Sequence, residues 1–362
     1  MSLYLGIDLG AVSANFVLLE EQRPRRQPRP GDVAQALYLR THGQPIAALQ
    51  QGLKQLAQSV GAQADTAAAC ATGSGRQLAG ALVGAELIKN EITAHYVGAT
   101  YLVPDVRTIF EIGGQDSKVI AVEDGLFTDF AMNTICAAGT GAFLDHQAER
   151  LGIPIERFGE LARRAKSPVR IGGRCTVFAE SDMINKQQRG AALEDLVAGL
   201  CDAIVRNYLT NVCKDVPLRP PVVFQGGVAA NVGARDAFER ALGYQVIVPE
   251  HHTVMGALGA ALLAREEASS KALQRTFRGF EVADATFEAL SFDCDECDNA
   301  CEVTVLIQES QPVACWGSRC GRWSQDLAQA AARAVQAAAS LPDASVGAQQ
   351  PARPGLETCA HG

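Results

Sequence analysis

The sequence predicts an α/β protein made of two similar lobes, followed by a small cysteine-rich module near its C-terminal end. A strand, a turn of glycine and acidic residues, and a second strand occur within residues 3–19 and recur within residues 108–122. Five of the eleven cysteines lie between Phe292 and Trp323. The chain has 362 residues, of which 48% are hydrophobic, and this is enough for roughly two domains with buried cores.

The first lobe is expected within residues 1–130. Apolar residues run from Leu3 to Leu9, stop at Gly10 and resume after Ser13, which is typical of a hairpin. Further along, apolar residues recur at the spacing of one helix face. The predicted elements are strands at 3–9, 15–19, 36–40 and 66–72, with a helix at 45–60 before the last strand and a loop at 73–76 after it.

The second lobe is expected within residues 131–270, although the repeated strand pair begins earlier, at Thr108. A run of small residues from Val254 to Ala264 predicts a closing helix that packs tightly against its neighbours. The predicted elements are strands at 108–112 and 117–122, helices from 141 to 211, a strand at 221–225, a helix after 231 and the closing helix at 254–264.

Beyond about Lys271 the composition changes. A cysteine-rich module is expected at 285–325 and an alanine-rich helix at 324–340. The tail at 341–362 contains proline and glycine with few large apolar residues, so we expect it to be disordered.

Composition excludes several classes of protein. The net charge is −8 and the isoelectric point is near 5.4, so the whole chain offers no electrostatic case for binding nucleic acid or an anionic membrane. The basic residues at 23–29 are interrupted by prolines and are interpreted as a solvated loop. No apolar run approaches the roughly 20 residues that a membrane span needs, and no signal sequence is recognised. We expect a cytoplasmic protein.

The scattered cysteines Cys70, Cys201 and Cys213 stand among apolar neighbours and are expected to be packed in the core. In a reducing compartment, clustered cysteines favour a metal rather than a disulfide framework.

Three glycine turns point to a nucleotide site. Asp8 and Gly10 end the first strand, and a second turn of acids and glycines follows the strand at 108–112. Glycine N–H groups can bind phosphates, and acidic side chains can hold Mg²⁺ through water. The third turn contains Gly226 and Gly227. Either strand turn alone is more often an ordinary hairpin, but the order of all three is far more specific.

The order of these turns resembles that of sugar kinases, actin and the heat-shock chaperone ATPases. The resemblance implies a duplicated actin/ribonuclease-H-like ATPase fold whose two lobes bind ATP in the cleft between them. The candidate catalytic residues are Asp8, Glu111, Gln115 and Asp116, with Gln115 orienting the attacking water. The candidate nucleotide-binding residues are Gly10, Ser13, Gly113, Gly114, Gly139, Gly141, Gly226, Gly227, Val228 and Gly256.

Two further cysteines, Cys136 and Cys175, stand where a nucleotide site has no use for thiols. Each precedes a predicted helix, and helix N-termini favour an anionic group such as a thiolate-ligated cluster. A four-iron cluster needs four thiolates, whereas these two positions supply only half. A homodimer with one [4Fe-4S] cluster on its two-fold axis is the simplest closed arrangement. The alternative is that both cysteines are small buried residues.

The combined motifs identify a narrower family. Residues 71–76, 111–118, 136–141, 175–181 and 226–229 resemble the ATPases that activate 2-hydroxyacyl-CoA dehydratases, which include ATPase subunits of benzoyl-CoA reductase. The resemblance covers residues 3 to about 264. It implies an activase that uses ATP to pass a low-potential electron from a cluster held by Cys136 and Cys175 to a partner iron–sulfur dehydratase or reductase. A cluster of low potential also predicts ferredoxin or flavodoxin as its electron donor.

The first turn departs from the family, which has small hydroxyl residues and then a lysine after the glycine. Here Ala11, Val12 and Asn15 stand instead, and Ser13 is the only hydroxyl. Backbone N–H groups can still bind phosphate after these changes, whereas direct side-chain contact is in question.

A separate metal is predicted in the C-terminal module. Cys294, Cys297 and Cys301 form a C-x2-C-x3-C pattern, and Cys320 follows in a glycine-containing loop. Four thiols of this kind suit Zn²⁺ or a second [4Fe-4S] cluster. Cys315 is a further candidate ligand, although Trp316 beside it makes a packing role equally reasonable.

Two other classes of function remain open. The chain can be a small-molecule kinase of the same superfamily with structural cysteines, or a non-catalytic nucleotide-binding regulator or metal-binding scaffold. Iron content separates the activase from the kinase, and ATP turnover separates both from the regulator.

Overall fold

The computed structural model describes residues 2–21, 32–61, 64–133, 137–173, 175–270 and 273–339. The chain divides into two compact units at the boundary between Ala285 and Thr286. Three features of the sequence analysis lie outside the described residues, namely the basic loop at 23–29, Cys136 and the tail at 341–362. Within the described ranges, no helix combines the length and apolar character needed to span a bilayer.

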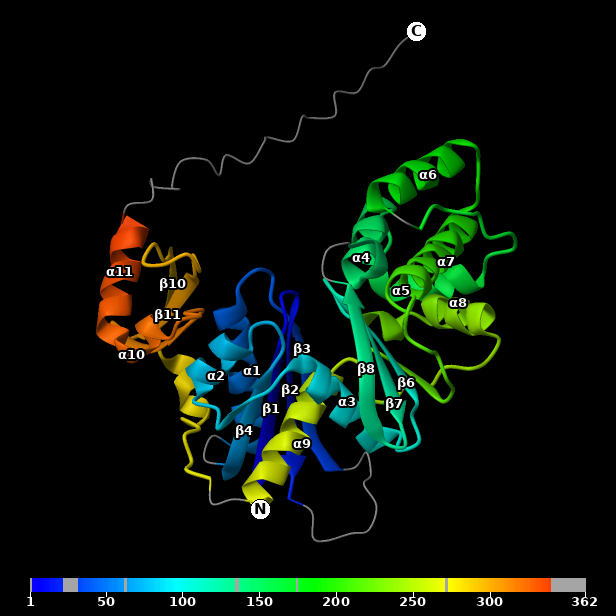
Figure 1. The fold of residues 1–362 in the computed structure, drawn as a ribbon. Coiled ribbons are helices and arrows are strands. Elements are labelled where there is room, and N and C mark those ends of the chain that lie inside the picture. Colours follow the sequence, from blue (N-terminus) through cyan, green and yellow to red (C-terminus); the bar gives the residue numbers. More distant parts are fainter. Residues whose placement is uncertain are drawn as a thin grey trace. The chain divides into compact units, whose positions relative to one another are not determined.

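The first lobe is built on a five-stranded sheet with the order β3-β2-β1-β4-β5 (Figure 1). Its strands are β1 (Leu3–Leu9), β2 (Ser13–Glu20), β3 (Val33–Arg40), β4 (Thr66–Thr72) and β5 (Leu87–Ile88). The central strand β1 is buried along its whole length between antiparallel β2 and parallel β4. Burial on both faces explains why its sequence is an almost continuous apolar run.

Helices cover both faces of this sheet. The helices of this lobe are α1 (Pro45–Val60), α2 (Arg76–Val83), α3 (Glu91–Leu102) and α9 (Met255–Ser270). The bounds of α1 match the sequence prediction, and a proline at its start suits the first turn of a helix. The sequence analysis left α2 and α3 unpredicted. In α3, Asn90 caps the N-terminus by accepting a hydrogen bond from the backbone N–H of Ile92 at 2.7 Å.

The second lobe contains a four-stranded sheet with the order β8-β7-β6-β9. Its strands are β6 (Thr108–Ile112), β7 (Ser117–Glu123), β8 (Leu126–Asn133) and β9 (Val222–Gln225). The expected division of the lobes near residue 130 therefore falls inside β8, and it is wrong for this sheet. The reason is that β6 pairs in parallel with β9, far along the chain, so the second lobe begins with β6.

One face of the second sheet is covered by helices of the second lobe. The helices of this lobe are α4 (Gly141–Arg150), α5 (Ile155–Arg163), α6 (Thr176–Gln188), α7 (Leu193–Asn211) and α8 (Val232–Leu242), with short 3-10 helices at Ala137–Gly139 and Gly227–Ala230. The core on this face includes Phe110, Phe224, Phe238 and Tyr208. Cys201 and Cys213 are buried in the same core, as the sequence predicts.

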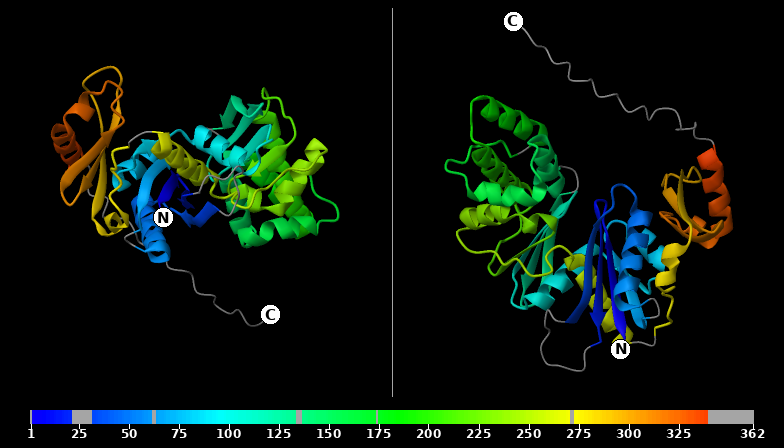
Figure 2. Two further views of the ribbon diagram at one scale, coloured as in Figure 1. Left: turned by 90° about the horizontal axis from the view of Figure 1, so that it is seen from below. Right: turned by 180° about the vertical axis from the view of Figure 1, so that it is seen from behind.

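The helices α3 and α9 pack between the two sheets. One core cluster joins residues of these helices with Val17 and Cys70 of the first sheet and with Ile109 and Val223 of the second. The contact of α9 with β1 is very close, because a Cβ placed on Gly6 would lie 1.9 Å from the carbonyl oxygen of Ala257. Figure 2 shows the yellow α9 beside the blue strands in both views. The prediction of a tightly packed small-residue helix is therefore confirmed.

The second compact unit has its own sheet and core. Its strands, β10 (Phe287–Asp293), β11 (Glu302–Gln308) and β12 (Gln311–Trp316), are antiparallel in that order, and its helices are α10 (Arg322–Gln325) and α11 (Leu327–Ala339). Phe292, Val303, Val305 and Trp323 are buried together with alanines of α11. A 3-10 helix at Phe280–Asp284 ends the first unit. The sequence analysis predicted the alanine-rich helix but not the three strands.

Candidate nucleotide site

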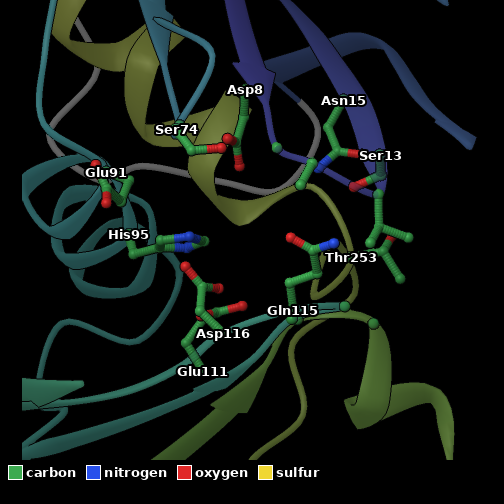
Figure 3. Close-up of a pocket in the computed structure, with 18 of the residues that line it drawn as sticks. Asp8, Ser13, Asn15, Ser74, Glu91, His95, Glu111, Gln115, Asp116 and Thr253 are labelled. Carbon is green, nitrogen blue, oxygen red and sulfur yellow. The ribbon is translucent and has the colours of Figure 1, made fainter. Parts of the chain in front are cut away.

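The two strand turns of the lobes line one polar cavity of about 260 Å³ (Figure 3). The β1–β2 turn comes from the first lobe and the β6–β7 turn from the second, and the third glycine turn completes the wall. Of the residues singled out from the sequence, this cavity is lined by Asp8, Gly10, Ser13, Glu111, Gly113, Gly114, Gln115, Asp116, Gly226 and Gly227.

Backbone hydrogen bonds shape both turns in the same way. The N–H of Gly10 donates to the carbonyl of Ser13 at 2.8 Å, and the N–H of Gly113 donates to the carbonyl of Asp116 at 3.0 Å. The two turns lie against each other, because a Cβ on Gly114 would meet the side chain of Val12 at 2.8 Å. The absence of a side chain at Gly114 therefore permits this close approach.

A second cavity of about 360 Å³ lies beside the first and shares part of its wall. The shared residues are Val12, Tyr38, Gly113, Gly114, Gly227 and Thr253. Its remaining wall contains the apolar side chains of Leu144, Ile155 and Val228, and it also includes the charged residues Arg40, Asp145 and Glu156. A polar cavity joined to a more apolar one suits a ligand with phosphates at one end and a flat base at the other.

Lys118 compensates the acids of the second turn. Its Nζ lies 3.1 Å from Glu111 Oε2 and 2.8 Å from Asp116 Oδ1. Burial opposes the charge of Lys118, but the two carboxylates outweigh burial and raise the pKa of the lysine. Burial also raises the pKa of Glu111 to about 7, against the opposing effect of Lys118. Lys118 therefore brings a positive charge to the wall of this cavity from the second lobe.

Asp8 is buried opposite this group, at the end of β1. Burial raises the pKa of Asp8, and nearby His95 and Lys118 act in the opposite direction. Burial lowers the pKa of His95 to about 4, so the ring is neutral near pH 7. Figure 3 shows His95 lying between Asp8 and the pair formed by Glu111 and Asp116.

Several lining residues were missed by sequence reasoning. They are Asn15, Tyr38, Ser74, Glu91, His95, Lys118, His252 and Thr253. Asn15 is buried, and among the described residues nothing donates a hydrogen bond to its Oδ1. An unpaired buried acceptor beside a cavity fits a site built for a ligand or ordered water. The Asn90 cap before Glu91 was a signal for helix α3, and recognising it would have placed His95 on a helix.

Some candidate residues do not line either cavity. Gly256 supports the site from behind, because a Cβ there would lie 2.2 Å from Asp8 Oδ2. Gly139 instead approaches α7, where a Cβ would lie 2.7 Å from Asn207 Oδ1. Cys175 is the N-cap residue of α6, in agreement with the predicted helix start, and it is partly exposed.

The C-terminal cysteines differ in exposure. Cys294 and Cys301 are buried, whereas Cys297 and Cys320 are exposed. The indole N–H of Trp323 donates to Cys294 Sγ at 3.1 Å, and the backbone N–H of Arg319 donates to Cys301 Sγ at 3.3 Å. In the part of the chain that the structure describes, no three or more His, Cys, Asp or Glu side chains are arranged to hold a metal by themselves.

Comparison with known proteins shows which family contains this arrangement of residues. Residues 5–264 match the family described as BadF/BadG/BcrA/BcrD ATPase. The (R)-2-hydroxyglutaryl-CoA dehydratase activating ATPase of Acidaminococcus fermentans is 35% identical over 272 residues, which cover 74% of this chain and 100% of that protein. The activator of lactoyl-CoA dehydratase of Anaerotignum propionicum is 35% identical over 269 residues, covering 74% of this chain and 99% of that protein. A benzoyl-CoA reductase component of Thauera aromatica is 32% identical over 178 residues, covering 47% of this chain and 63% of that protein.

A solved structure has the same fold over the first unit. The activator of the 2-hydroxyisocaproyl-CoA dehydratase from Clostridium difficile, with bound ADPNP, superimposes with a TM-score of 0.67 at 32% identity. The match covers 74% of this chain and 96% of that protein. The family match ends before the C-terminal unit begins at Thr286.

Proposed function

Because this chain belongs to the BadF/BadG/BcrA/BcrD ATPase family, we propose that it is a reductive activase. In this proposal, ATP hydrolysis drives transfer of a low-potential electron from a dimer-bridging [4Fe-4S] cluster to a partner iron–sulfur enzyme. The observation that carries the proposal is the backbone connection between the β6–β7 turn and the segment that follows Cys136.

That connection consists of two hydrogen bonds. The N–H of Gly141 donates to the carbonyl of Gly113, and the N–H of Ala142 donates to the carbonyl of Gly114, both at 2.8 Å. Gly141 begins α4, five positions after Cys136 in the sequence. A movement of the glycine turn on nucleotide binding or hydrolysis is therefore transmitted directly to the chain that carries a cluster ligand.

The cavity fits Mg-ATP by its donors and its glycines. Mg²⁺ supplies positive charge that stabilises the phosphoryl group during transfer. Asp8, Glu111 and Asp116 would hold the hydrated ion, and those N–H groups of the glycine turns that are not donated within the turns would bind the phosphates. Gln115 orients the attacking water.

The surface around Cys175 supports the proposed dimer. Val177 and Phe178 follow this cysteine on α6 and are 66% and 73% exposed. Large apolar side chains at such exposure are typical of an interface, and a two-fold axis beside them would bring two copies of Cys175 together. Each copy would add its own Cys136, so that four thiolates surround one cluster.

The partner is proposed from the relatives, one named as a dehydratase activating ATPase and one as part of benzoyl-CoA reductase. We propose that this chain serves an enzyme of the same type, and that ferredoxin or flavodoxin reduces its cluster. A coupling of about 1–3 kcal/mol between nucleotide and cluster would shift a one-electron potential by roughly 40–130 mV. This shift assists transfer but requires a cluster of low intrinsic potential.

Electron transfer to the purified partner is expected to be faster with Mg-ATP than with Mg-ADP or a non-hydrolysable analogue. The reason is that only hydrolysis makes the conformational change irreversible. Anaerobic stopped-flow measurements with the three nucleotides test this. Equal rates in all three conditions would reject nucleotide control and leave an ATPase that also binds an iron–sulfur cluster.

We propose separately that Cys294, Cys297, Cys301 and Cys320 bind Zn²⁺ or a second iron–sulfur cluster. The N–H donors of Trp323 and Arg319 to the two buried sulfurs support this proposal, since such contacts orient and stabilise metal-bound sulfur. Binding would draw the exposed Cys297 and Cys320 toward the buried pair.

Cys297→Ser together with Cys320→Ser is expected to lower the bound zinc or iron by one site per chain, measured by elemental analysis of the anaerobically purified full chain. Cys70→Ala serves as the control, because burial raises the pKa of Cys70 to about 12 and keeps it a neutral thiol. If the double variant binds as much metal as the wild type, the proposal that these cysteines bind a metal is rejected.

A further inference from the structure

A buried hydrogen bond joins the two lobes at the base of the nucleotide cavity. His95 lies on α3, which packs against the first lobe, and Gln225 is the last residue of β9 in the second lobe. Gln225 Nε2 lies 3.0 Å from His95 Nδ1. The two residues are only 7% and 0% exposed, so this bond is shielded from bulk solvent.

Close packing of α3 on α9 fixes the place of His95. A Cβ on Gly98 would lie 2.5 Å from the carbonyl oxygen of Met255, and one on Gly259 would lie 1.8 Å from that of Ala94. Glycine thus permits backbone contact at two points along these helices. The contact brings His95 next to Gly256, where a Cβ would lie 3.3 Å from His95 Cε1 and 2.2 Å from Asp8 Oδ2.

The sheet fixes the place of Gln225. It stands in register with Glu111 across the parallel pair of β9 and β6, so both side chains leave the same face of the sheet. Gly226 follows with φ at 92°, and a Cβ there would lie 2.8 Å from Glu111 Oε1. Within the described residues, no donor reaches Gln225 Oε1. His95 is therefore the side chain that its amide contacts across the cleft.

We propose that His95 and Gln225 form a positioning pair, which holds Asp8 of the first lobe and Glu111 of the second at the separation that a hydrated Mg²⁺ bound to phosphates requires. This inference rests on the proposed nucleotide site. Neither residue needs to touch the nucleotide. The amide of Gln225 donates to Nδ1, so the neutral ring keeps its proton on Nε2.

Two variants of His95 distinguish the roles of the two ring nitrogens, Nδ1 and Nε2. His95→Asn places an amide near the position of Nδ1 and can keep the bond to Gln225, whereas His95→Gln places its amide near the position of Nε2 and loses that bond. Gln225→Met removes the amide at nearly constant volume. Tyr96→Phe is the matched control on the same helix, because Tyr96 is directed to the carbonyl of Gly125 outside the cavity.

The readouts are kcat for ATP hydrolysis and the Mg²⁺-dependent gain in affinity for a fluorescent ATP analogue. We expect His95→Gln and Gln225→Met each to lower kcat by roughly 10- to 100-fold, as small misplacements of reacting groups do, and to abolish most of the Mg²⁺-dependent gain. Affinity for the analogue without Mg²⁺ should stay within about threefold of the wild type. His95→Asn should retain more of both properties than His95→Gln.

The double variant decides whether the residues act as a unit. The losses in His95→Gln with Gln225→Met should be far from additive, because either change alone breaks the same bond. Additive losses, or equal behaviour of His95→Asn and His95→Gln, would overturn the pair. Thermal unfolding identifies any variant that fails to fold, and the other single variants then carry the test. A wild-type protein without Mg²⁺-dependent nucleotide binding would instead refute the proposed nucleotide site.

Discussion

Asp8→Asn is expected to lower the rate of ATP hydrolysis by about 10²- to 10³-fold. A carboxylate that orders a hydrated Mg²⁺ at the phosphates stabilises developing charge by several kcal/mol, and each 1.36 kcal/mol changes the rate about tenfold. The substitution should leave the packing intact, because Asn has the shape of Asp. Gly73 and Gly256 enclose the carboxylate so closely that Cβ atoms on them would lie 2.4 and 2.2 Å from its oxygens.

Phosphate release and Mg²⁺-dependent binding of a fluorescent nucleotide measure the effect of this change. Asp236→Asn is the control, since Asp236 pairs with Arg163 at 2.7 Å on a partly exposed surface and should be silent in both assays. An unchanged rate in Asp8→Asn would remove Asp8 from the catalytic site and leave Glu111 and Asp116 as the candidate acids.

Cys175→Ser is expected to abolish the proposed bridging cluster and with it the proposed electron transfer. A dimer that carries this change loses two of the four proposed thiolates at once, and a serine hydroxyl is not a thiolate ligand. The residue is the N-cap of α6, where serine is favoured, so the helix should remain. Iron and sulfide analysis and the visible absorption of the anaerobic protein measure the loss, and ATP binding should persist.

Cys213→Ala is the matched control for the cluster. Burial raises the pKa of Cys213 to about 12, and the residue packs in the core of the second lobe. Its removal should leave the iron content unchanged. A chain ending at Ala285 that binds a complete cluster as a monomer would contradict the two-fold arrangement, because one copy would then supply every ligand.

Local signals in the sequence determined a large part of the first unit. Regular spacing of apolar residues and a proline at the first position defined α1 from Pro45 to Val60. Glycines next to acids marked the turns after β1 and β6, and Asn231 marked the start of α8 by capping it. Each of these features depends on residues within one or two turns of chain, so it can be read without the fold.

Only the tertiary structure decided how the candidate site is assembled. Asp8 and Glu111 belong to different sheets, and the packing of α3 and α9 between those sheets brings them to one cavity. The same packing carries His95 across to Gln225, which is 130 positions away along the chain. Such contacts cannot be predicted from residue spacing, because they form only when burial brings distant segments of the chain together.

The lobe boundary and the cation of the site were decided in the same way. Pairing of β6 with β9 assigned residues 108–133 to the second lobe. The sequence analysis had instead placed the boundary between the lobes near residue 130. The sequence analysis assigned no cationic side chain to the site, whereas the structure places Lys118 of β7 between Glu111 and Asp116. Composition and motif order therefore determined which chemistry to expect, whereas long-range packing selected the side chains that meet.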